Sequence, residues 1–191
     1  MMYEPKNFER LLGIDGFSDI ILRNHFTLYE GYVSNVNKLL EFFKTAEKGT
    51  PVWNELRRRF GWEWNGMRLH EFYFGSLVKN GNPIDPKSAL AKKINEDFGS
   101  FEAFEKDFKA TGAMRGIGWA ILVYDTGAKK LLNVWSNEHD AGHLAGTTIL
   151  LPLDVFEHAF ALDYGLKRAD YINAFWNAID WNIVSTRFGG K

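Results

Sequence analysis

The sequence predicts an α+β fold, with a long N-terminal helical hairpin followed by a C-terminal α/β unit that holds a small three-stranded antiparallel sheet flanked by helices. Two observations support this prediction. Apolar residues recur at helical spacing through the first half of the chain, whereas short β-rich runs occur in the second half. Between them, residues 79–83 (Lys-Asn-Gly-Asn-Pro) form the clearest break. We therefore expect a helical hairpin domain over residues 1–81 and an α+β domain over residues 82–191.

The N-terminal hairpin is expected to contain two long helices. Ser18 can cap the first, which begins at Asp19, where an acidic side chain suits the positive end of the helix dipole. Its predicted buried face repeats at helical spacing: His25, Tyr29, Tyr32, Val36, Leu39 and Phe43. Residues 49–51 (Gly-Thr-Pro) end this helix. The second helical stretch runs from about residue 52 to residue 77, and two internal glycines weaken it.

The C-terminal unit is expected to begin with two shorter helices and to continue with the sheet. Residues 88–98 and 101–109 have helical patterns, and Gly99 and Ser100 between them suit a helix end and a new cap. Three β-rich runs follow, at residues 119–124, 131–135 and 147–151. A hairpin turn joins the first two runs. A last helix is predicted over residues 170–184.

The overall composition excludes several classes of protein. The chain has 191 residues, of which 46% are hydrophobic and 25% charged, an ordinary balance for a globular protein. Its 23 basic and 24 acidic residues give a formal net charge of −1, so we expect no nucleic-acid partner. The longest apolar runs are too short to cross a bilayer, and the N-terminus lacks a signal-peptide pattern. We therefore expect a cytoplasmic location and no membrane partner.

Two features of the composition bear on a functional site. The chain contains no cysteine, which excludes disulfide scaffolds, thiolate zinc sites, iron–sulfur clusters and cysteine nucleophiles. Any metal chemistry must therefore use imidazole and carboxylate ligands. Aromatic residues make up 16% of the chain, more than a small core requires, which favours a site shielded from water.

Metal-binding side chains occur on apolar faces at three places. His25 and Tyr32 are seven residues apart, so on a helix both point to the same side. His70 lies among aromatic residues. Asp154 and His158 are four residues apart, so on a helical turn they could face one ion. Taken singly, each is more often a core histidine, a core aromatic or a salt bridge, but together three imidazoles and one carboxylate suit iron, manganese or zinc.

A second histidine pair is formed by His139 and His143, within the stretch Glu-His-Asp-Ala-Gly-His. The two histidines are four residues apart, as in a helical zinc pair. However, Gly142 and the preceding strand favour a loop, which spoils that geometry. The simpler interpretation is a polar loop between strands.

Taken in order along nearly the whole chain, these motifs resemble the iron/manganese superoxide dismutase family. The most specific part is Asp154-Val155-Phe156-Glu157-His158 beside Gly118-Trp119, whereas the helix with His25 is less specific. The resemblance continues in two further segments, Leu162-Asp163-Tyr164 and Arg168-Ala169-Asp170-Tyr171, and ends with Phe175-Trp176.

The resemblance implies a mononuclear metal site with a redox activity. One iron or manganese ion would be bound by four side chains, with a solvent molecule as fifth ligand: His25, His70, Asp154 and His158. The reaction would be the disproportionation of superoxide to dioxygen and hydrogen peroxide. In the family's pattern Tyr32 is the gate beside the open position, and Arg168 lies near the approach funnel. Glu157 would reach His158 of the partner subunit in a homodimer or homotetramer.

Some departures from the family's pattern concern the first helix and the dimer. Tyr32 follows His25 one residue sooner than usual, so we expect the family's bulged turn to be absent. Aligning on Tyr32 instead would put Asn24, a poor ligand, at the metal. Residues 28–29 (Leu-Tyr) stand where the family has a second histidine, and Ala161 replaces its interface tyrosine. Those two family residues bond across the dimer, so their joint loss puts that contact in question.

Another departure concerns the hydrogen-bonding amide near the metal. Iron-type members carry a glutamine where this chain has Gly66, and manganese-type members carry it where this chain has His139. His139 is therefore our candidate for a hydrogen bond to the metal-bound solvent, the alternative being a surface loop histidine. Trp119 and Phe156, which replaces a usual tryptophan, are expected to line the pocket. The sequence does not choose between iron and manganese.

Two other functions could use the same residues. A zinc-dependent hydrolase would need a general base, and Glu71 beside His70 is the obvious candidate. Adjacent helical residues diverge by about 100°, so Glu71 should point away from the metal. A non-catalytic dimerising relative would keep the fold without the activity. In every case the ligands come from both predicted domains, so the metal site is expected between them.

Overall fold

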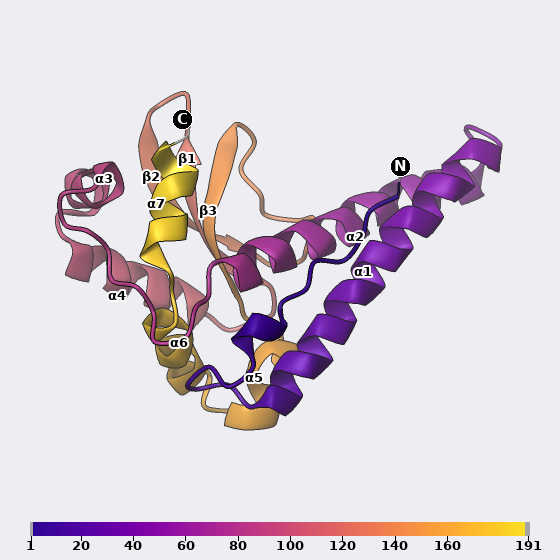
Figure 1. Ribbon diagram of the computed structural model, residues 1–191. Coiled ribbons are helices and arrows are strands. Elements are labelled where there is room, and N and C mark those ends of the chain that lie inside the picture. Colours follow the sequence, from indigo (N-terminus) through magenta and orange to yellow (C-terminus); the bar gives the residue numbers. More distant parts are fainter. Residues whose placement is uncertain (1, 190–191) are drawn as a thin grey trace.

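The protein forms two long helices packed as a hairpin and a three-stranded sheet with shorter helices around it (Figure 1). The computed structural model describes residues 2–189. Its helices are α1 (Asp19–Thr45), α2 (Pro51–Gly75), α3 (Ala89–Phe98), α4 (Phe101–Gly112), α5 (Glu157–Tyr164), α6 (Arg168–Asn177) and α7 (Trp181–Gly189), with a short 3-10 turn, η1 (Glu9–Leu11), before α1. Its strands are β1 (Trp119–Asp125), β2 (Lys130–Ser136) and β3 (Thr147–Asp154). The predicted α+β fold class is confirmed.

The two hairpin helices begin where the sequence predicts. The Ser18 hydroxyl accepts a hydrogen bond from the Ile21 N–H (3.1 Å), and this satisfies an amide that the first helical turn leaves unpaired. Thr50 caps α2 in the same way at the Trp53 N–H (3.3 Å), with Pro51 in the first helical position. In Figure 1 the two helices run together as an arm that projects from the part of the molecule containing the sheet.

Both long helices are continuous, although glycines weaken the second. α1 runs for 27 residues without a bulged turn, so His25 and Tyr32 lie on the same buried face. α2 continues through Gly66 because this glycine has a packing role: a Cβ atom there would lie 2.7 Å from the Tyr32 ring. The low helical propensity of glycine is thus offset by the close approach of α1 and α2.

The sheet has the order β2–β1–β3, with both pairs of neighbours antiparallel. β3 is longer than the predicted run and extends through Pro152, which is tolerated because β3 is an edge strand. Trp119, the first residue of β1, is paired with Ser136 at the end of β2 and with Asp154 at the end of β3. This register gathers the start of β1, the loop after β2 and the end of β3 at one end of the sheet.

The prediction of a single last helix over residues 170–184 is wrong. The structure has two helices there, α6 and α7, separated at residues 178–180. Three backbone hydrogen bonds connect this break to the segment after α2: Val78 N–H to Ala178 O (2.9 Å), Asn82 N–H to Ile179 O (2.9 Å) and Asp180 N–H to Ser76 O (2.7 Å). These long-range bonds satisfy backbone groups that would otherwise continue the helix.

Two arginines from opposite ends of the chain hold the C-terminus of α2. Arg10 donates hydrogen bonds to the carbonyls of Phe74 (3.0 Å) and Leu77 (2.6 Å). Arg187 donates to the carbonyl of Phe72 (3.1 Å), and burial lowers its pKa to about 10, so it stays charged at neutral pH. Unpaired carbonyls and the negative end of the helix dipole favour cations at this point. The end of α2 that carries a candidate ligand is therefore fixed in place.

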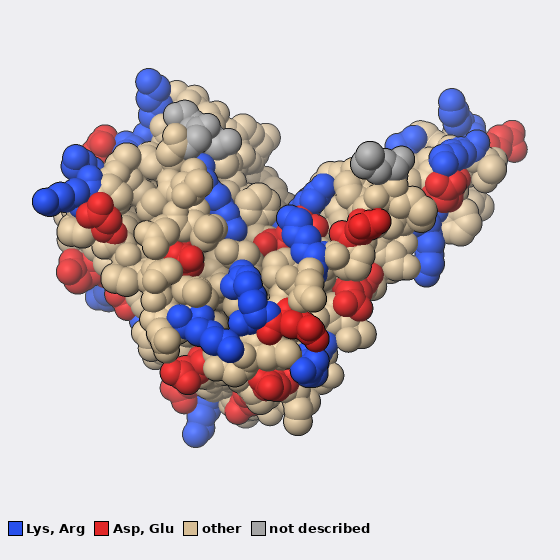
Figure 2. All heavy atoms as spheres, in the orientation of Figure 1, with Lys and Arg blue, Asp and Glu red and all other residues tan. Residues whose placement is uncertain are grey.

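Charged residues of both signs are interspersed over the surface. Figure 2 shows Lys and Arg side chains next to Asp and Glu side chains across the face that it draws. Several of them form exposed pairs at helical spacing, such as Lys44 with Glu41 (2.7 Å) and Arg58 with Glu55 (2.9 Å). Such pairs add little stability. Within residues 2–189, no helix combines the length and the apolar character that a membrane span requires.

Candidate metal centre

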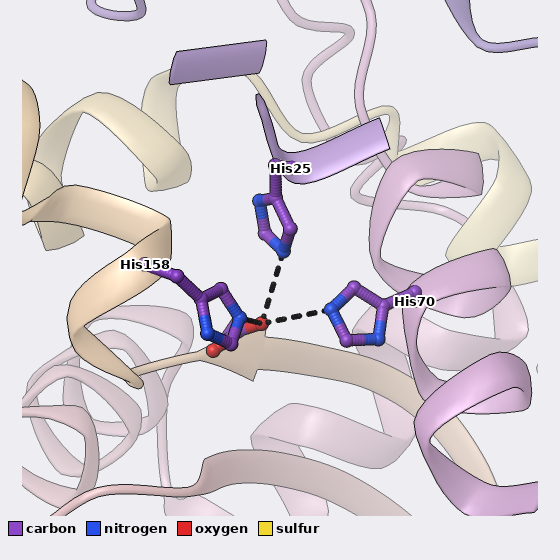
Figure 3. A group of neighbouring side chains, drawn as sticks. His25, His70 and His158 are labelled. Atoms are coloured by element: carbon purple, nitrogen blue, oxygen red, sulfur yellow. Dashed lines mark hydrogen bonds and ion pairs between the residues drawn. The ribbon is translucent and has the colours of Figure 1, made fainter. Parts of the chain in front are cut away.

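The four side chains predicted as metal ligands meet in the structure, and we call them the ligand cluster. His25 comes from α1, His70 from α2, Asp154 from the end of β3 and His158 from α5, and their ligand atoms all lie within 4.8 Å of one another. Figure 3 shows the three imidazole rings converging on one carboxylate oxygen. The Nε2 atoms of His25, His70 and His158 lie 3.2, 3.5 and 3.0 Å from Asp154 Oδ2.

Hydrogen bonding within the ligand cluster leaves lone pairs for a cation. His70 Nδ1 lies 2.6 Å from the Gly66 carbonyl, which can only accept, so Nδ1 carries the proton and Nε2 presents its lone pair to the cluster. Among the described residues, Nε2 of His25 and Nε2 of His70 are buried without an aligned hydrogen-bond partner. Such a nitrogen costs free energy unless a ligand satisfies it. Imidazole and carboxylate suit iron, manganese and zinc, so these residues fit a metal ion.

The charges within the ligand cluster also suit a cation. Burial lowers the pKa of His25 and brings that of His70 well below 6.5, so both are neutral at pH 7. Burial opposes ionisation of Asp154, but His158 and His25 outweigh it and hold the pKa of the carboxyl well below 3.8. Burial also opposes a charge on His158, yet Asp154 raises the His158 pKa. The cluster thus offers one anion and two neutral imidazoles. A metal ion can displace the proton from the third imidazole, that of His158.

The prediction that Asp154 and His158 share a helical turn is wrong. Asp154 is the last residue of β3, and His158 is the second residue of α5. The chain turns between them with Asp154 Oδ1 accepting the Phe156 N–H (2.9 Å), which leaves Oδ2 facing the histidines. A strand end followed by a helix start brings the two side chains together as well as a helical turn would.

A buried tyrosine pair supports the carboxylate ligand. Tyr171 Oη donates to the Asp154 carbonyl (2.6 Å) and also bonds Tyr73 Oη (3.0 Å). Both side chains are fully buried, and burial raises their pKa values, so both hydroxyls keep their protons. Tyr171 lies within the predicted last helix, residues 170–184. The sequence did not reveal its hydroxyl partner, because the only signal is that a buried tyrosine needs one.

Tyr32 and His139 form a hydrogen bond beside the ligand cluster. Tyr32 Oη lies 2.8 Å from His139 Nε2, and the Tyr32 ring packs with its centroid 5.1 Å from that of His70. On the other side of the imidazole, Trp119 Nε1 donates to His139 Nδ1 (3.0 Å). His139 is fully buried although it lies between β2 and β3, so it is not a surface loop histidine. Burial lowers its pKa to about 4.

Aromatic rings enclose the Tyr32–His139 pair. The His139 ring centroid lies 4.8 Å from that of Phe156 and 4.6 Å from that of Trp62. Trp62 Nε1 donates in turn to Glu138 Oε2 (3.0 Å). The sequence did not indicate Trp62, because its partners lie on a loop 76 residues away. The predicted lining residues Trp119 and Phe156 do lie here, with the Trp119 ring centroid 5.2 Å from that of His70.

Comparisons with known proteins identify the family. The profile of the C-terminal domain of iron/manganese superoxide dismutases matches residues 86–187. The iron superoxide dismutase of Cupriavidus metallidurans is 37% identical over 195 residues, covering 98% of this chain and 97% of that protein. The iron enzyme of Saccharolobus solfataricus is 37% identical over 176 residues (88% and 83% covered), and manganese superoxide dismutase 2 of Haloferax volcanii is 35% identical over 173 residues (88% and 85% covered). The chain belongs to the iron/manganese superoxide dismutase family.

The structure supports the alignment of the first helix with the family's pattern that puts His25, and not Asn24, at the metal. α1 has no bulged turn, as the short spacing predicts, and His25 points into the ligand cluster. Asn24, the alternative, is exposed. Gly66, at the position of the iron-type glutamine, could not carry a side chain without displacing the Tyr32 ring. Relatives named for iron and for manganese match at similar identity, so the comparisons leave both metals open.

The residues at the family's dimer-contact positions have other surroundings here. Tyr29 Oη donates to Glu71 Oε1 (3.1 Å) and accepts the Lys6 N–H (3.0 Å), and Ala161 is exposed. Glu71 is further held by the side chains of Lys6 (3.0 Å) and Arg68 (2.7 Å). Because these bonds tie Glu71 to the N-terminal segment, the residue does not supply the general base that a zinc hydrolase would need.

Glu157 and Arg168 are not members of the ligand cluster. Glu157 is the exposed first residue of α5, next to His158 in the sequence. Arg168 donates to the carbonyls of Met114 (2.7 Å) and Gly116 (2.8 Å). Its guanidinium also lies over the Phe160 ring, 5.1 Å from the centroid. The guanidinium is thus fixed to the segment between α4 and β1.

Proposed function

We propose that this protein is a superoxide dismutase that converts superoxide to dioxygen and hydrogen peroxide at a single iron or manganese ion. The observation that carries the proposal is the ligand cluster. It brings three imidazoles and one carboxylate together from four elements, and two of the imidazole nitrogens are buried without hydrogen-bond partners. Family membership supports the reaction, and the ligand cluster supports it further because its four side chains could hold the ion.

Each ligand has a defined part in holding the ion. His70 binds through Nε2, because its Nδ1 proton is committed to the Gly66 carbonyl. Asp154 supplies the anionic ligand through Oδ2, with its own position fixed by the Phe156 N–H and by Tyr171. His25 and His158 complete the set through Nε2. When bound, the ion would supply the one-electron redox couple that disproportionation of superoxide requires.

Residues around the ligand cluster exclude water and manage protons. Trp119 and Phe156 close the pocket with apolar surface, which strengthens electrostatic interactions inside it. Reduction of superoxide to hydrogen peroxide consumes protons, and Tyr32 and His139 are the hydrogen-bonding side chains beside the cluster that can serve this need. We propose Tyr32 as the gate of the open side and Arg168 as a residue of the approach path.

We further propose a homodimer or homotetramer in the cytoplasm, with a helical hairpin domain over residues 1–81, an α+β domain over residues 82–191 and the metal between them. Exposure of Glu157 beside His158 at the start of α5 supports a contact from Glu157 to His158 of the partner subunit. The origin of two ligands in the hairpin and two in β3 and α5 supports a site between the domains.

Metal analysis combined with a superoxide assay tests the function. The purified protein is expected to contain iron or manganese near one ion per chain, and the iron-loaded or manganese-loaded protein is expected to consume superoxide. A protein that binds zinc alone and remains inactive with both iron and manganese would contradict the proposal.

A further inference from the structure

The turn before α1 is bonded to helix α5 of the C-terminal part of the chain. Ser18 donates two hydrogen bonds to the Asp163 carboxylate, from its N–H to Oδ2 (2.7 Å) and from its hydroxyl to Oδ1 (2.7 Å). The two residues are 145 positions apart in the sequence. Short bonds to a carboxylate are stronger than bonds between neutral groups. We call this contact the Ser18–Asp163 clamp.

Neighbouring contacts fix the same turn. The Gly16 carbonyl accepts a hydrogen bond from Tyr164 Oη (2.5 Å), and a Cβ atom at Gly16 would lie 2.6 Å from the Cβ atom of Ala174 in α6. Phe17 is buried, and its ring centroid lies 6.0 Å from that of Tyr171, the tyrosine that supports the carboxylate ligand. The turn therefore has a fixed place against both α5 and α6.

The Ser18–Asp163 clamp connects the two helices that carry His25 and His158. Ser18 is the N-cap of α1, and His25 lies seven residues later, about two turns into that helix. His158 and Asp163 lie near opposite ends of the short helix α5. In Figure 1, α5 lies beside the beginning of α1, and the two helices contact each other. Because both elements are regular helices, a bond between Ser18 and Asp163 also restrains His25 relative to His158.

This restraint matters because hydrogen bonds within the ligand cluster do not orient all of its members. His70 is oriented by the Gly66 carbonyl, 2.6 Å from its Nδ1. His25 Nε2, in contrast, is buried without an aligned hydrogen-bond partner. The place of His25 in the cluster therefore depends on where α1 lies. The ring centroids of His25 and His158 are only 4.8 Å apart, so a small displacement of α1 against α5 would change the geometry offered to an ion.

We propose that Ser18 and Asp163 are positioning residues of the metal site: they hold α1 against α5, keep His25 and His158 where both can bind one ion, and slow the release of that ion. This inference rests on the proposed function and deepens it. Partners that orient metal ligands change metal affinity by roughly 10–100-fold. The clamp lies at the surface and acts through two helices, so its effect should be at the lower end of that range.

Release of cobalt(II) from the loaded protein tests the inference without superoxide. Imidazole and carboxylate ligands bind this ion, and its visible absorption bands report how the ligands are arranged. Asp163→Ala removes both bonds of the clamp. We expect a shifted visible spectrum and a release to a chelator that is roughly tenfold faster than in the wild type. Asp163→Asn keeps one acceptor oxygen, so its release rate should lie between the two.

Asp19→Ala is the matched control for Asp163→Ala. Asp19 is also an exposed carboxylate at the start of α1, where it suits the helix dipole, and its Oδ1 accepts the Gly13 N–H (2.7 Å). The control thus removes a similar charge and a hydrogen bond from the same helix end but leaves the contact with α5 in place. Its visible spectrum should match that of the wild type, and its release rate should change less than about twofold.

Equal release rates in Asp163→Ala and Asp19→Ala, or a wild-type spectrum and rate in Asp163→Ala, would overturn the proposal. If Asp163→Ala does not fold, the comparison of Asp163→Asn with Asp19→Asn decides in the same way. A failure of the proposed function has a different signature: the wild-type protein would bind metal but would not consume superoxide when loaded with iron or manganese. A wild-type protein that binds no metal at all would contradict both.

Discussion

The ligand cluster and the adjacent hydrogen bonds of Trp119, His139 and Tyr32 differ in whether their buried polar atoms have hydrogen-bond partners. In the ligand cluster, two buried Nε2 atoms have no hydrogen-bond partner, and three nitrogens crowd one carboxylate oxygen. In the chain of Trp119, His139 and Tyr32, both imidazole nitrogens have partners at 2.8 and 3.0 Å. Buried polar atoms are almost always satisfied, so the two unpartnered Nε2 atoms require a partner such as a metal ion, whereas the satisfied imidazole of His139 is held in one orientation.

Removing the anion of the ligand cluster should have the largest effect. Asp154→Asn keeps the shape of the side chain but supplies no negative charge to the ion. Metal content should fall close to zero, and superoxide consumption should drop by more than about a hundredfold, since even residues that only orient ligands cost 10–100-fold. Metal analysis and the superoxide assay measure both effects.

Asp140→Asn is the matched control for this change, because it removes an exposed carboxylate from the loop next to His139. It should retain metal and most of its activity. Equal metal loss in the two variants would mean that the general charge of the region, and not the ligand cluster, holds the ion.

Metal removal should destabilise the protein through the same unsatisfied atoms. A ligand present at about a thousand times its dissociation constant stabilises the folded state by about 4 kcal/mol. For a chain of this size that corresponds to a melting temperature roughly 8–16 °C higher than that of the metal-free protein. Calorimetry of protein dialysed against a chelator, before and after adding back iron or manganese, measures the shift. An identical melting temperature in both forms would show that the cluster is satisfied without an ion.

The contact between α1 and α2 beneath Tyr32 predicts a smaller effect. Gly66→Ala places a Cβ atom 2.7 Å from the Tyr32 ring, so we expect a loss of roughly 1–3 kcal/mol in the free energy of unfolding and a displaced Tyr32. Gly61→Ala, in the same helix, meets only an Asp140 Cβ atom at 3.9 Å and should gain up to about 1 kcal/mol. Chemical denaturation compares the two. The packing role of Gly66 would be refuted by equal gains.

The smallest effect is expected at the rim of the pocket. Trp62→Phe loses the hydrogen bond to Glu138 and should lower the free energy of unfolding by about 1 kcal/mol. The 2.8 Å bond from His139 to Tyr32 has no part in that loss and should persist. Denaturation and a crystal structure of the variant check both statements. Loss of the His139–Tyr32 bond would show that Trp62, and not Trp119, holds the imidazole.

Local sequence was sufficient for most helices and for all four members of the ligand cluster. Caps such as Ser18 and helical spacing on α1 are properties of neighbouring residues, and the ligands stood out as polar groups on apolar faces. The break between α6 and α7 was not predictable in this way. It depends on hydrogen bonds from residues 178–180 to residues 76–82, about a hundred positions earlier in the chain.

The same reason explains what was missed around the ligand cluster. Trp62 owes its role to Glu138, and Tyr171 owes its role to the backbone of Asp154, and neither contact is local. His139 lies in a segment that looked like a polar loop, yet it is fully buried because Trp119, Phe156 and Trp62 close around it. The residue types were sufficient to predict the ligands, whereas the partners that orient them could be identified only from the fold.

The central claim is that His25, His70, Asp154 and His158 together bind one iron or manganese ion. Anomalous X-ray diffraction from crystals of the loaded protein, recorded at the iron and manganese absorption edges, tests it most directly. We expect a single anomalous peak within bonding distance of the three Nε2 atoms and Asp154 Oδ2, about the 2.0–2.2 Å that such nitrogen and oxygen ligands keep from a zinc ion. A peak elsewhere, or one that lacks any of these four ligands, would contradict it.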